Sequence, residues 1–144
     1  MFKASNAEQM LKSKGVSVTP LRLSVFGTLI SAEKCLMAEE ILKQVGSINK
    51  VTVYRILEKL VEVKLVRRFS IKRTFYYEIA DKDHKPHPHL VCKICGKVRC
   101  LNASELMIIL SNLCKLYGFQ ADNINVSIEG VCNKCSKQHS CKIV

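Results

Sequence analysis

Two pairs of cysteines share one spacing and could bind a single metal ion together. The pairs are Cys92 with Cys95 and Cys132 with Cys135, each with two residues between the thiols. This spacing lets a tight turn direct both sulfur atoms at one ion, and two such pairs make the closed four-sulfur shell of structural zinc. Two redox dithiols are the alternative interpretation. The stretch 96–131 is too long for a simple zinc ribbon, so we expect it to contain a helix and strands.

The composition favours reduced thiols. With 144 residues, the chain forms one large domain or two small ones. It has no apolar run near the roughly 20 residues that a membrane span needs, and its first residues lack the apolar segment of a secretion signal. We therefore expect a cytoplasmic protein with no membrane partner, whose eight cysteines are available to metal.

The charge is strongly positive and unevenly divided. Residues 1–80 hold 14 Lys and Arg against 7 Asp and Glu (+7), and residues 81–144 hold 9 against 5 (+4), which gives the net +11. Four thiolates around a zinc ion would lower the charge of the second half further. This excess indicates a polyanionic partner, most often nucleic acid, although a basic protein without such a partner is the simpler alternative.

The N-terminal half has the apolar spacing of helices followed by a hairpin. Thr19 caps a helix that Pro20 begins, and Asn49 caps another. We expect helices near 4–14, 20–30, 37–45 and 50–63, and strands at 65–71 and 74–79. Two helices joined by a short turn form a helix-turn-helix, and the hairpin with Lys72 and Arg73 at its tip adds a wing suited to phosphates.

The C-terminal half has a different pattern. We expect strands at 90–92, 98–101 and 123–129, and a helix at 104–117 that Ser104 caps. Four apolar residues of this helix are expected to face inward: Leu106, Ile109, Leu110 and Leu113. The sequence thus predicts an α+β protein with a winged helix-turn-helix domain (1–80), a polar hinge (81–88) and a small α/β domain (89–144).

These elements, in this order, resemble the ferric uptake regulator (Fur) family of DNA-binding repressors. The resemblance rests on five segments: Val18-Thr19-Pro20-Leu21-Arg22, Thr52-Val53-Tyr54-Arg55, His87-Pro88-His89-Leu90-Val91-Cys92, Cys95-Gly96-Lys97 and the Cys132/Cys135 pair. It implies a winged helix joined by a hinge to a dimerisation domain with a structural zinc site made of the four paired cysteines. It also implies a homodimer that binds palindromic double-stranded operator DNA when loaded with metal.

The resemblance also implies which residues contact DNA. Tyr54 would touch bases, with Thr52 beside it in the same segment, and Arg55 would hold a phosphate. Arg22 and Arg73 are further phosphate candidates. The chemistry agrees, because a tyrosine ring can contact a thymine methyl group and a guanidinium suits phosphate oxygens. The alternative is that Tyr54 packs into the core and the cations are only solvated.

A regulatory metal site at the hinge follows from the same resemblance. Its candidate ligands here are Cys35, Glu78, His87, His89 and Cys100, of which we expect four to bind at once. The two histidines alternate along an extended segment, so both rings point to one side. Two positions depart from the family pattern, because Cys35 replaces the usual histidine and Cys100 replaces the usual carboxylate.

Thiolate and imidazole ligands favour Zn(II) over oxygen-preferring ions such as Mn(II). We therefore expect a zinc-responsive repressor, with Fe(II) as the alternative ion and a peroxide-responsive repressor as a further alternative. Cys35 could instead be a buried apolar residue. A third metal site of the family is not expected, because its positions hold Pro86, Pro88, Met107 and Ile124.

Two hypotheses from other classes compete with the repressor. A zinc hydrolase or thiol oxidoreductase would need an open metal position and a general base, and the sequence has no nucleophile-base pattern and no H-E-x-x-H. A DNA-binding module with structural zinc alone is the other. We expect no enzyme activity. The roles of Cys114, His139 and Cys141 stay open.

Overall fold

The computed structural model describes residues 4–80 and 85–138. The chain divides into two compact units, residues 1–84 and 85–144. Part of the expected hinge, 81–84, and the candidates His139 and Cys141 lie outside the described residues. None of the described helices has the length and apolar character needed to cross a bilayer.

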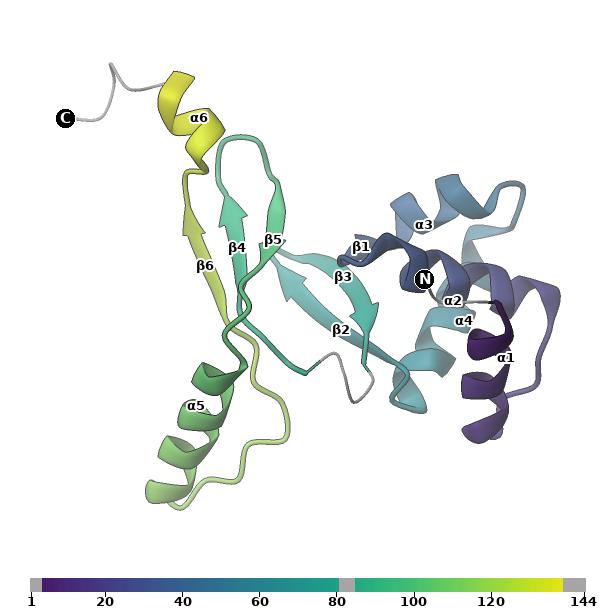
Figure 1. The fold of residues 1–144 in the computed structure, drawn as a ribbon, viewed down its shortest axis with the longest axis horizontal. Helices are drawn as coiled ribbons and strands as arrows, with labels where there is room; N and C mark the ends of the chain where they lie inside the picture. Colours follow the sequence, from purple (N-terminus) through teal and green to yellow (C-terminus); the bar gives the residue numbers. More distant parts are fainter. Residues whose placement is uncertain (1–3, 81–84, 139–144) are drawn as a thin grey trace. The chain divides into compact units, whose positions relative to one another are not determined.

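The first unit combines four helices with a three-stranded sheet (Figure 1). Its elements are α1 (Ala4–Ser13), α2 (Pro20–Ala32), β1 (Leu36–Met37), α3 (Ala38–Val45), α4 (Lys50–Glu62), β2 (Val66–Ile71) and β3 (Thr74–Ile79). The strands follow the antiparallel order β1-β3-β2. This is the winged helix-turn-helix that the sequence predicts, with α3 and α4 as the helix pair and β2-β3 as the wing.

Local capping explains where two of the helices begin. The Thr19 hydroxyl accepts a hydrogen bond from the Arg22 amide at 3.2 Å, and Pro20 opens α2. The Asn49 side chain accepts from the Val51 amide at 2.9 Å at the start of α4. Such caps satisfy amides that a helix leaves unpaired, so both predicted starts are confirmed.

The core of the first unit joins the helices to the sheet. Side chains of α2 and α4 are among its largest fully buried members, with Phe26 and Leu57 both at 0% exposure, and Leu36 and Tyr77 add contacts from the strands. Burial of this kind is the main source of stability for a small domain. This packing fixes one side of α4 in the core, and the opposite side of the helix faces outward.

The wing turn has an unusual backbone. Lys72 and Arg73 have φ values of 49° and 67°, in the left-handed region that favours glycine or asparagine. A two-residue hairpin turn of type I′ has this conformation at both positions, and its twist matches that of the strands. The turn therefore presents two exposed cations at positions where smaller residues would fit more easily.

The second unit is a three-stranded sheet with two helices. Its elements are β4 (His89–Cys92), β5 (Val98–Cys100), α5 (Ser104–Leu116), β6 (Ser127–Gly130) and α6 (Asn133–Gln138). The order is β5-β4-β6, with β4 antiparallel to β5 and parallel to β6. Within this unit, α5 and α6 lie at opposite ends of the sheet (Figure 1).

The structure differs from the sequence predictions in three local features. The short strand β1 and the helix α6 were not predicted, because two and six residues carry too little periodicity to detect. Ser104 is the first residue of α5 rather than its cap. The cap position is Ala103, whose side chain cannot accept a hydrogen bond. β6 begins at Ser127, later than the predicted 123.

One face of α5 is apolar and exposed in the single chain. Ile109 and Leu113, which were expected to face inward, are 55% and 46% exposed, and Leu116 is 81% exposed. The periodicity correctly marks an apolar stripe, but nothing in the described part of this chain covers it. Contiguous exposed apolar surface of this kind marks an interface between proteins.

Candidate metal centres and nucleic-acid interface

The four paired cysteines form one cluster in the second unit. Cys92 ends β4, Cys95 lies in the turn that follows, Cys132 precedes α6 and Cys135 lies within it. Their sulfur atoms all lie within 4.8 Å of one another. Gly96, with φ of 73°, closes the first turn by donating its amide to the Cys92 carbonyl at 2.9 Å. This grouping, called the four-cysteine cluster below, suits one ion in a closed shell and is not two separate dithiols.

Backbone hydrogen bonds around this cluster favour the thiolate form of two of its cysteines, Cys92 and Cys132. The Cys132 amide donates to the Cys92 sulfur at 3.4 Å, and this hydrogen bond is the first cause that lowers the pKa of Cys92 to about 6. A backbone hydrogen bond from Cys135 likewise lowers the pKa of Cys132. The pKa of Cys135 is raised to about 12, first by its hydrogen bond with the Cys132 side chain. Thiolates are the form that binds metal, so the donor set and its backbone fit a soft divalent ion.

A second group of potential ligands lies at the start of the second unit. The ligand atoms of His87, His89 and Cys100 all lie within 4.8 Å of one another. Pairing of β4 with β5 sets His89 opposite Cys100, and the two imidazole rings are 4.8 Å apart between centroids. His89 is only 3% exposed. Two imidazoles and a thiolate form a set that binds zinc or iron more readily than calcium or magnesium.

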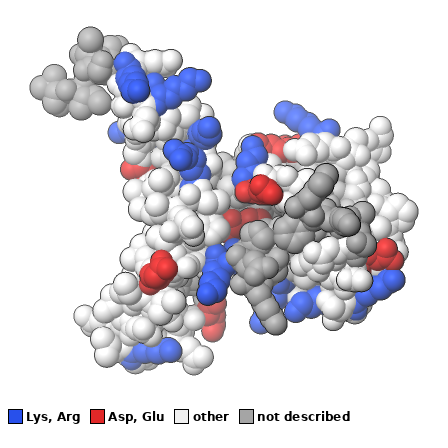
Figure 2. Space-filling view, viewed as in Figure 1, with Lys and Arg blue, Asp and Glu red and all other residues white. Residues whose placement is uncertain are grey.

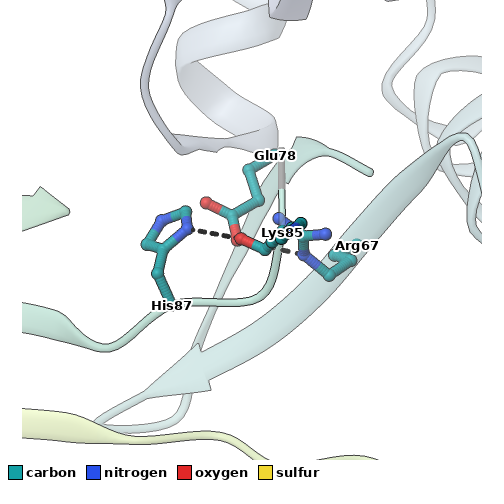
Figure 3. A network of polar contacts seen from close by, with 4 residues as sticks. All are labelled: Arg67, Glu78, Lys85 and His87. Atoms are coloured by element: carbon teal, nitrogen blue, oxygen red, sulfur yellow. Dashed lines mark hydrogen bonds and ion pairs between the residues drawn. The ribbon is translucent and has the colours of Figure 1, made fainter. Parts of the chain in front are cut away.

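The tautomer of His87 follows from a backbone contact. Its Nδ1 lies 2.8 Å from the Lys85 carbonyl oxygen, which can only accept a hydrogen bond (Figure 3). Nδ1 therefore carries the proton, and Nε2 carries the in-plane lone pair of the ring in this tautomer. A carbonyl that orients a metal-binding histidine in this way is a common supporting contact.

The remaining two candidate ligands, Cys35 and Glu78, belong to the first unit. Cys35 is buried directly before β1, and Glu78 is buried on β3. Because Leu36 pairs with Tyr77 in an antiparallel register, residues 35 and 78 lie at the same end of the β1-β3 pair. The sequence predicted both residues in one site but did not predict β1, the strand that aligns them. The burial of Cys35 fits a ligand and also fits the apolar alternative.

Arg67 is a polar partner that sequence reasoning missed. Its Nε donates to the Glu78 carboxylate oxygen Oε1 at 3.3 Å (Figure 3). The two residues are direct cross-strand partners in the β2-β3 hairpin. Counting outward from the predicted two-residue turn at Lys72 and Arg73 could have found this pair, because the turn fixes the register of both strands.

The candidate DNA-contacting residues all lie in the first unit. Arg55 is exposed on α4, while Thr52 and Tyr54 are half-buried on the same helix. Arg73 is exposed at the wing turn, and Arg22 donates to the Ser17 carbonyl at 2.9 Å from the start of α2. Figure 2 shows basic side chains spread over the face in view with fewer acidic ones among them, as suits a protein that binds a polyanion.

Tyr54 has two environments at once. Part of its side chain packs against the core of the first unit, as the packing alternative expected. The Lys50 ammonium lies 5.9 Å from the centre of its ring. A half-buried tyrosine with a neighbouring cation is held in place while part of it stays accessible.

Comparison with known proteins agrees with this architecture. Residues 13–129 match the model of the "Ferric uptake regulator family". The Haemophilus influenzae ferric uptake regulation protein is 27% identical over 141 residues, covering 92% of this chain and 95% of its own. The Bacillus subtilis peroxide operon regulator is 26% identical over 139 residues, covering 93% and 94%.

Solved structures show the same fold. The ferric uptake regulator of Vibrio cholerae superposes with a TM-score of 0.70 at 27% identity, covering 87% of this chain and 98% of its own. A zinc uptake regulator complexed with zinc and DNA gives a TM-score of 0.72 at 23% identity, covering 96% and 95%, a level that supports the fold alone. The resemblance seen in the sequence is thus confirmed. The chain belongs to the ferric uptake regulator family, whose members are metal-dependent, DNA-binding regulators of transcription and not enzymes.

Proposed function

We propose that this chain is a zinc-responsive repressor that binds palindromic operator DNA as a homodimer when a regulatory metal ion is bound. The observation that carries the proposal is the presence of two separate sets of soft ligands in one Fur-family chain. One is the closed four-cysteine cluster, and the other includes His87, His89 and Cys100. A protein with structural metal alone would have no use for the second set.

The four-cysteine cluster is proposed to hold structural zinc. Cys92 and Cys95 lie at the end of β4 and in the turn after it, whereas Cys132 and Cys135 flank the start of α6, so one ion would join two segments far apart in the sequence. Binding of such an ion contributes directly to folding, because the unfolded chain has no preformed site. The four cysteines leave no open position for a substrate.

The regulatory ion is proposed to take ligands from both units. Cys35 and Glu78 would contribute from the first unit, and His87, His89 and Cys100 from the second. Sharing an ion in this way would favour conformers in which the two DNA-binding units of a dimer match the operator spacing. The two thiols and two imidazoles favour Zn(II). The alternatives to a zinc response are an iron response and a peroxide response, since the relatives include a ferric uptake regulation protein and a peroxide operon regulator.

The exposed apolar face of α5 is proposed to form part of the homodimer interface. Large apolar residues in or just after this helix are at least 46% exposed: Ile108, Ile109, Leu113, Leu116, Tyr117 and Phe119. A second copy would bury this surface, as obligate dimers commonly do. A two-fold dimer also matches the symmetry of a palindromic operator.

In the DNA complex, α4 is proposed to enter the major groove. Tyr54 and Thr52 would contact base edges or thymine methyl groups, and Arg55 would contact phosphate. Arg22 and Arg73 would bind phosphates of the DNA backbone on either side of this contact. Since chromosomal operators are the proposed target, we place the protein in the cytoplasm.

A metal titration tests the proposed function. Protein that retains the ion of the four-cysteine cluster is stripped of the regulatory ion, and its affinity for operator DNA is measured by fluorescence anisotropy with added Zn²⁺, Fe²⁺ or Mn²⁺. We expect affinity to rise with Zn²⁺ at the lowest free concentration, because the ligand set is soft. Equal affinity with and without metal would instead identify a constitutive DNA-binding module.

Arg55→Ala should weaken binding to every operator sequence to a similar degree, because a phosphate contact carries no base information. The slope of log affinity against log salt should fall by about 1. Lys12→Ala is the charge-matched control, since Lys12 pairs with Glu8 on α1 at 2.9 Å. An unchanged salt slope in Arg55→Ala would remove this residue from the interface.

A further inference from the structure

We propose that Val51 recognises thymine in the operator by packing against the C5 methyl group of that base in the major groove. The inference rests on the proposed function, in which α4 enters this groove. Val51 is the second residue of α4 and is 55% exposed. The structure describes α4 from end to end, and among its exposed residues Val51 is the single apolar one, beside Lys50, Arg55, Glu58 and Glu62.

The position of Val51 on the helix directs its side chain away from the core. The residues of α4 that are buried in the core are Val53, Ile56, Leu57 and Leu60. With about 3.6 residues per turn, Val51 lies on the side of the helix opposite this buried group. Arg55, four residues later, lies on the same outward side. A helix in the major groove presents its outward side to the DNA, so Val51 faces the base pairs together with a candidate contact residue.

The charges along the outward side determine which end of α4 can approach DNA. The first half of the helix carries Lys50 and Arg55, whereas the second half carries Glu58 and an ion pair between Lys59 and Glu62 at 3.4 Å. Phosphates repel carboxylates at close range, and they are attracted by the partial positive charge of a helix N-terminus. The first two turns of α4, which include the exposed valine, therefore enter deepest. Recognition helices commonly use their N-terminal residues for base contacts.

The start of α4 holds Val51 in a fixed position. The Asn49 side chain accepts a hydrogen bond from the Val51 amide at 2.9 Å. This cap occupies the amide, so Val51 offers DNA its side chain rather than its backbone. A valine in a helix has one strongly preferred χ1 rotamer, so it loses little conformational freedom when it binds.

Thymine is the base that matches an exposed, rigid apolar side chain. It presents a methyl group in the major groove, where cytosine presents only a hydrogen at the same ring position. Contact between this methyl group and Val51 removes apolar surface of both partners from water. The contact therefore favours a T·A pair at one position of each half-site.

Substitution of uracil for thymine in the operator tests this contact, because uracil lacks the methyl group and keeps the same base pairing. Operator duplexes are selected from a random library with the Zn²⁺-loaded parent protein. Each thymine position is then replaced by uracil in both half-sites, one position at a time, and affinity is measured by fluorescence anisotropy at constant salt. For the parent, we expect uracil at one position to weaken binding by about three- to tenfold, as suits the loss of a small apolar contact.

The variant Val51→Ala should be insensitive to this particular methyl group. It should bind the unmodified operator about three- to tenfold more weakly than the parent, and uracil at the critical position should change its affinity by less than about twofold. Penalties at other thymines, including any that Tyr54 contacts, should remain. Alanine favours a helix more than valine does, so the variant should unfold at the parent temperature or slightly above it. Weaker operator binding therefore cannot come from a loss of folding.

Val61→Ala is the matched control, with the same substitution on the same helix. Val61 packs half-buried against the core of the first unit, about 15 Å along the helix axis from Val51. This control should keep the uracil penalties of the parent. The inference is overturned if no thymine position is sensitive in the parent, or if Val51→Ala keeps every penalty. Loss of the same penalty in Val61→Ala would overturn it as well, since the effect would then belong to the whole helix.

The same measurements separate this inference from the proposed function. If the parent binds its operator only with metal and Arg55→Ala lowers the salt slope, while Val51→Ala keeps every uracil penalty, only the role of Val51 fails. If the parent binds equally well without metal, the proposed regulation fails. If Arg55→Ala keeps the parent salt slope and no thymine is sensitive, the proposed placement of α4 in the major groove fails along with the inference.

Discussion

Replacing Cys132 with serine is expected to remove the ion of the four-cysteine cluster and, with it, the fold of the second unit. Cys132 supplies one of the four sulfurs, and the substitution removes that sulfur while keeping the backbone amide that donates to the Cys92 sulfur. Apparent binding free energies of structural zinc are about 10–16 kcal/mol, so the loss of one ligand is large against the roughly 5–15 kcal/mol that holds a typical domain folded. The metal content should fall by one ion per chain, and size-exclusion chromatography should show loss of the dimer.

Cys114→Ser is the control for this change. Cys114 lies half-buried on α5, in the same unit, and its substitution should leave the cluster and its ion in place. Comparing metal content, oligomeric state and thermal unfolding of the two variants isolates the contribution of the cluster. A Cys132→Ser protein that remained a dimer with its full metal content would show that this cluster is not a structural site.

His89→Ala is expected to abolish the metal response while preserving the fold. His89 is buried on β4 opposite Cys100, where its ring can serve only a nearby partner or an ion. Loss of an outer contact to a metal ligand costs roughly 10–100-fold in affinity, and loss of the ligand itself should cost more. Operator binding in the presence of Zn²⁺ should therefore remain at the level of the protein without regulatory metal.

The internal control in this experiment is the ion of the four-cysteine cluster, which should remain at one per chain. Unfolding monitored by circular dichroism should show the parent transition once the regulatory ion is removed from both proteins. A His89→Ala protein that still gained operator affinity at the same free zinc concentration would exclude this residue from the shell.

Much of the fold could be predicted because its signals are local. Thr19 and Asn49 mark helix starts through short-range hydrogen bonds, and the apolar spacing of α4 is visible without knowing what it packs against. The four-cysteine cluster was predictable for a similar reason. A two-residue spacing limits the directions of a thiol pair, so two pairs in one chain indicate a common ion.

The features that could not be predicted depend on partners distant in sequence. Nothing in the two residues of β1 shows that Leu36 pairs with Tyr77, yet this pairing aligns Cys35 with Glu78. The stripe on α5 indicated burial, but no sequence pattern says whether the covering surface belongs to the same chain. The Arg67 contact with Glu78 is different, because counting outward from the predicted two-residue turn at 72–73 gives the register that pairs these two residues.

The parallel pairing of β4 with β6 has a consequence for how the protein is made. Cys92 and Cys132 are 40 positions apart, and the sheet and the sulfur cluster both need the later segment. Closing a loop of this length costs conformational entropy before any stabilising contact forms. During translation, β4 therefore stays without its parallel neighbour β6 until the later segment has been made. The winged helix can collapse on the ribosome as soon as it emerges, whereas the second unit matures only after residue 135 has left the exit tunnel and metal has been supplied.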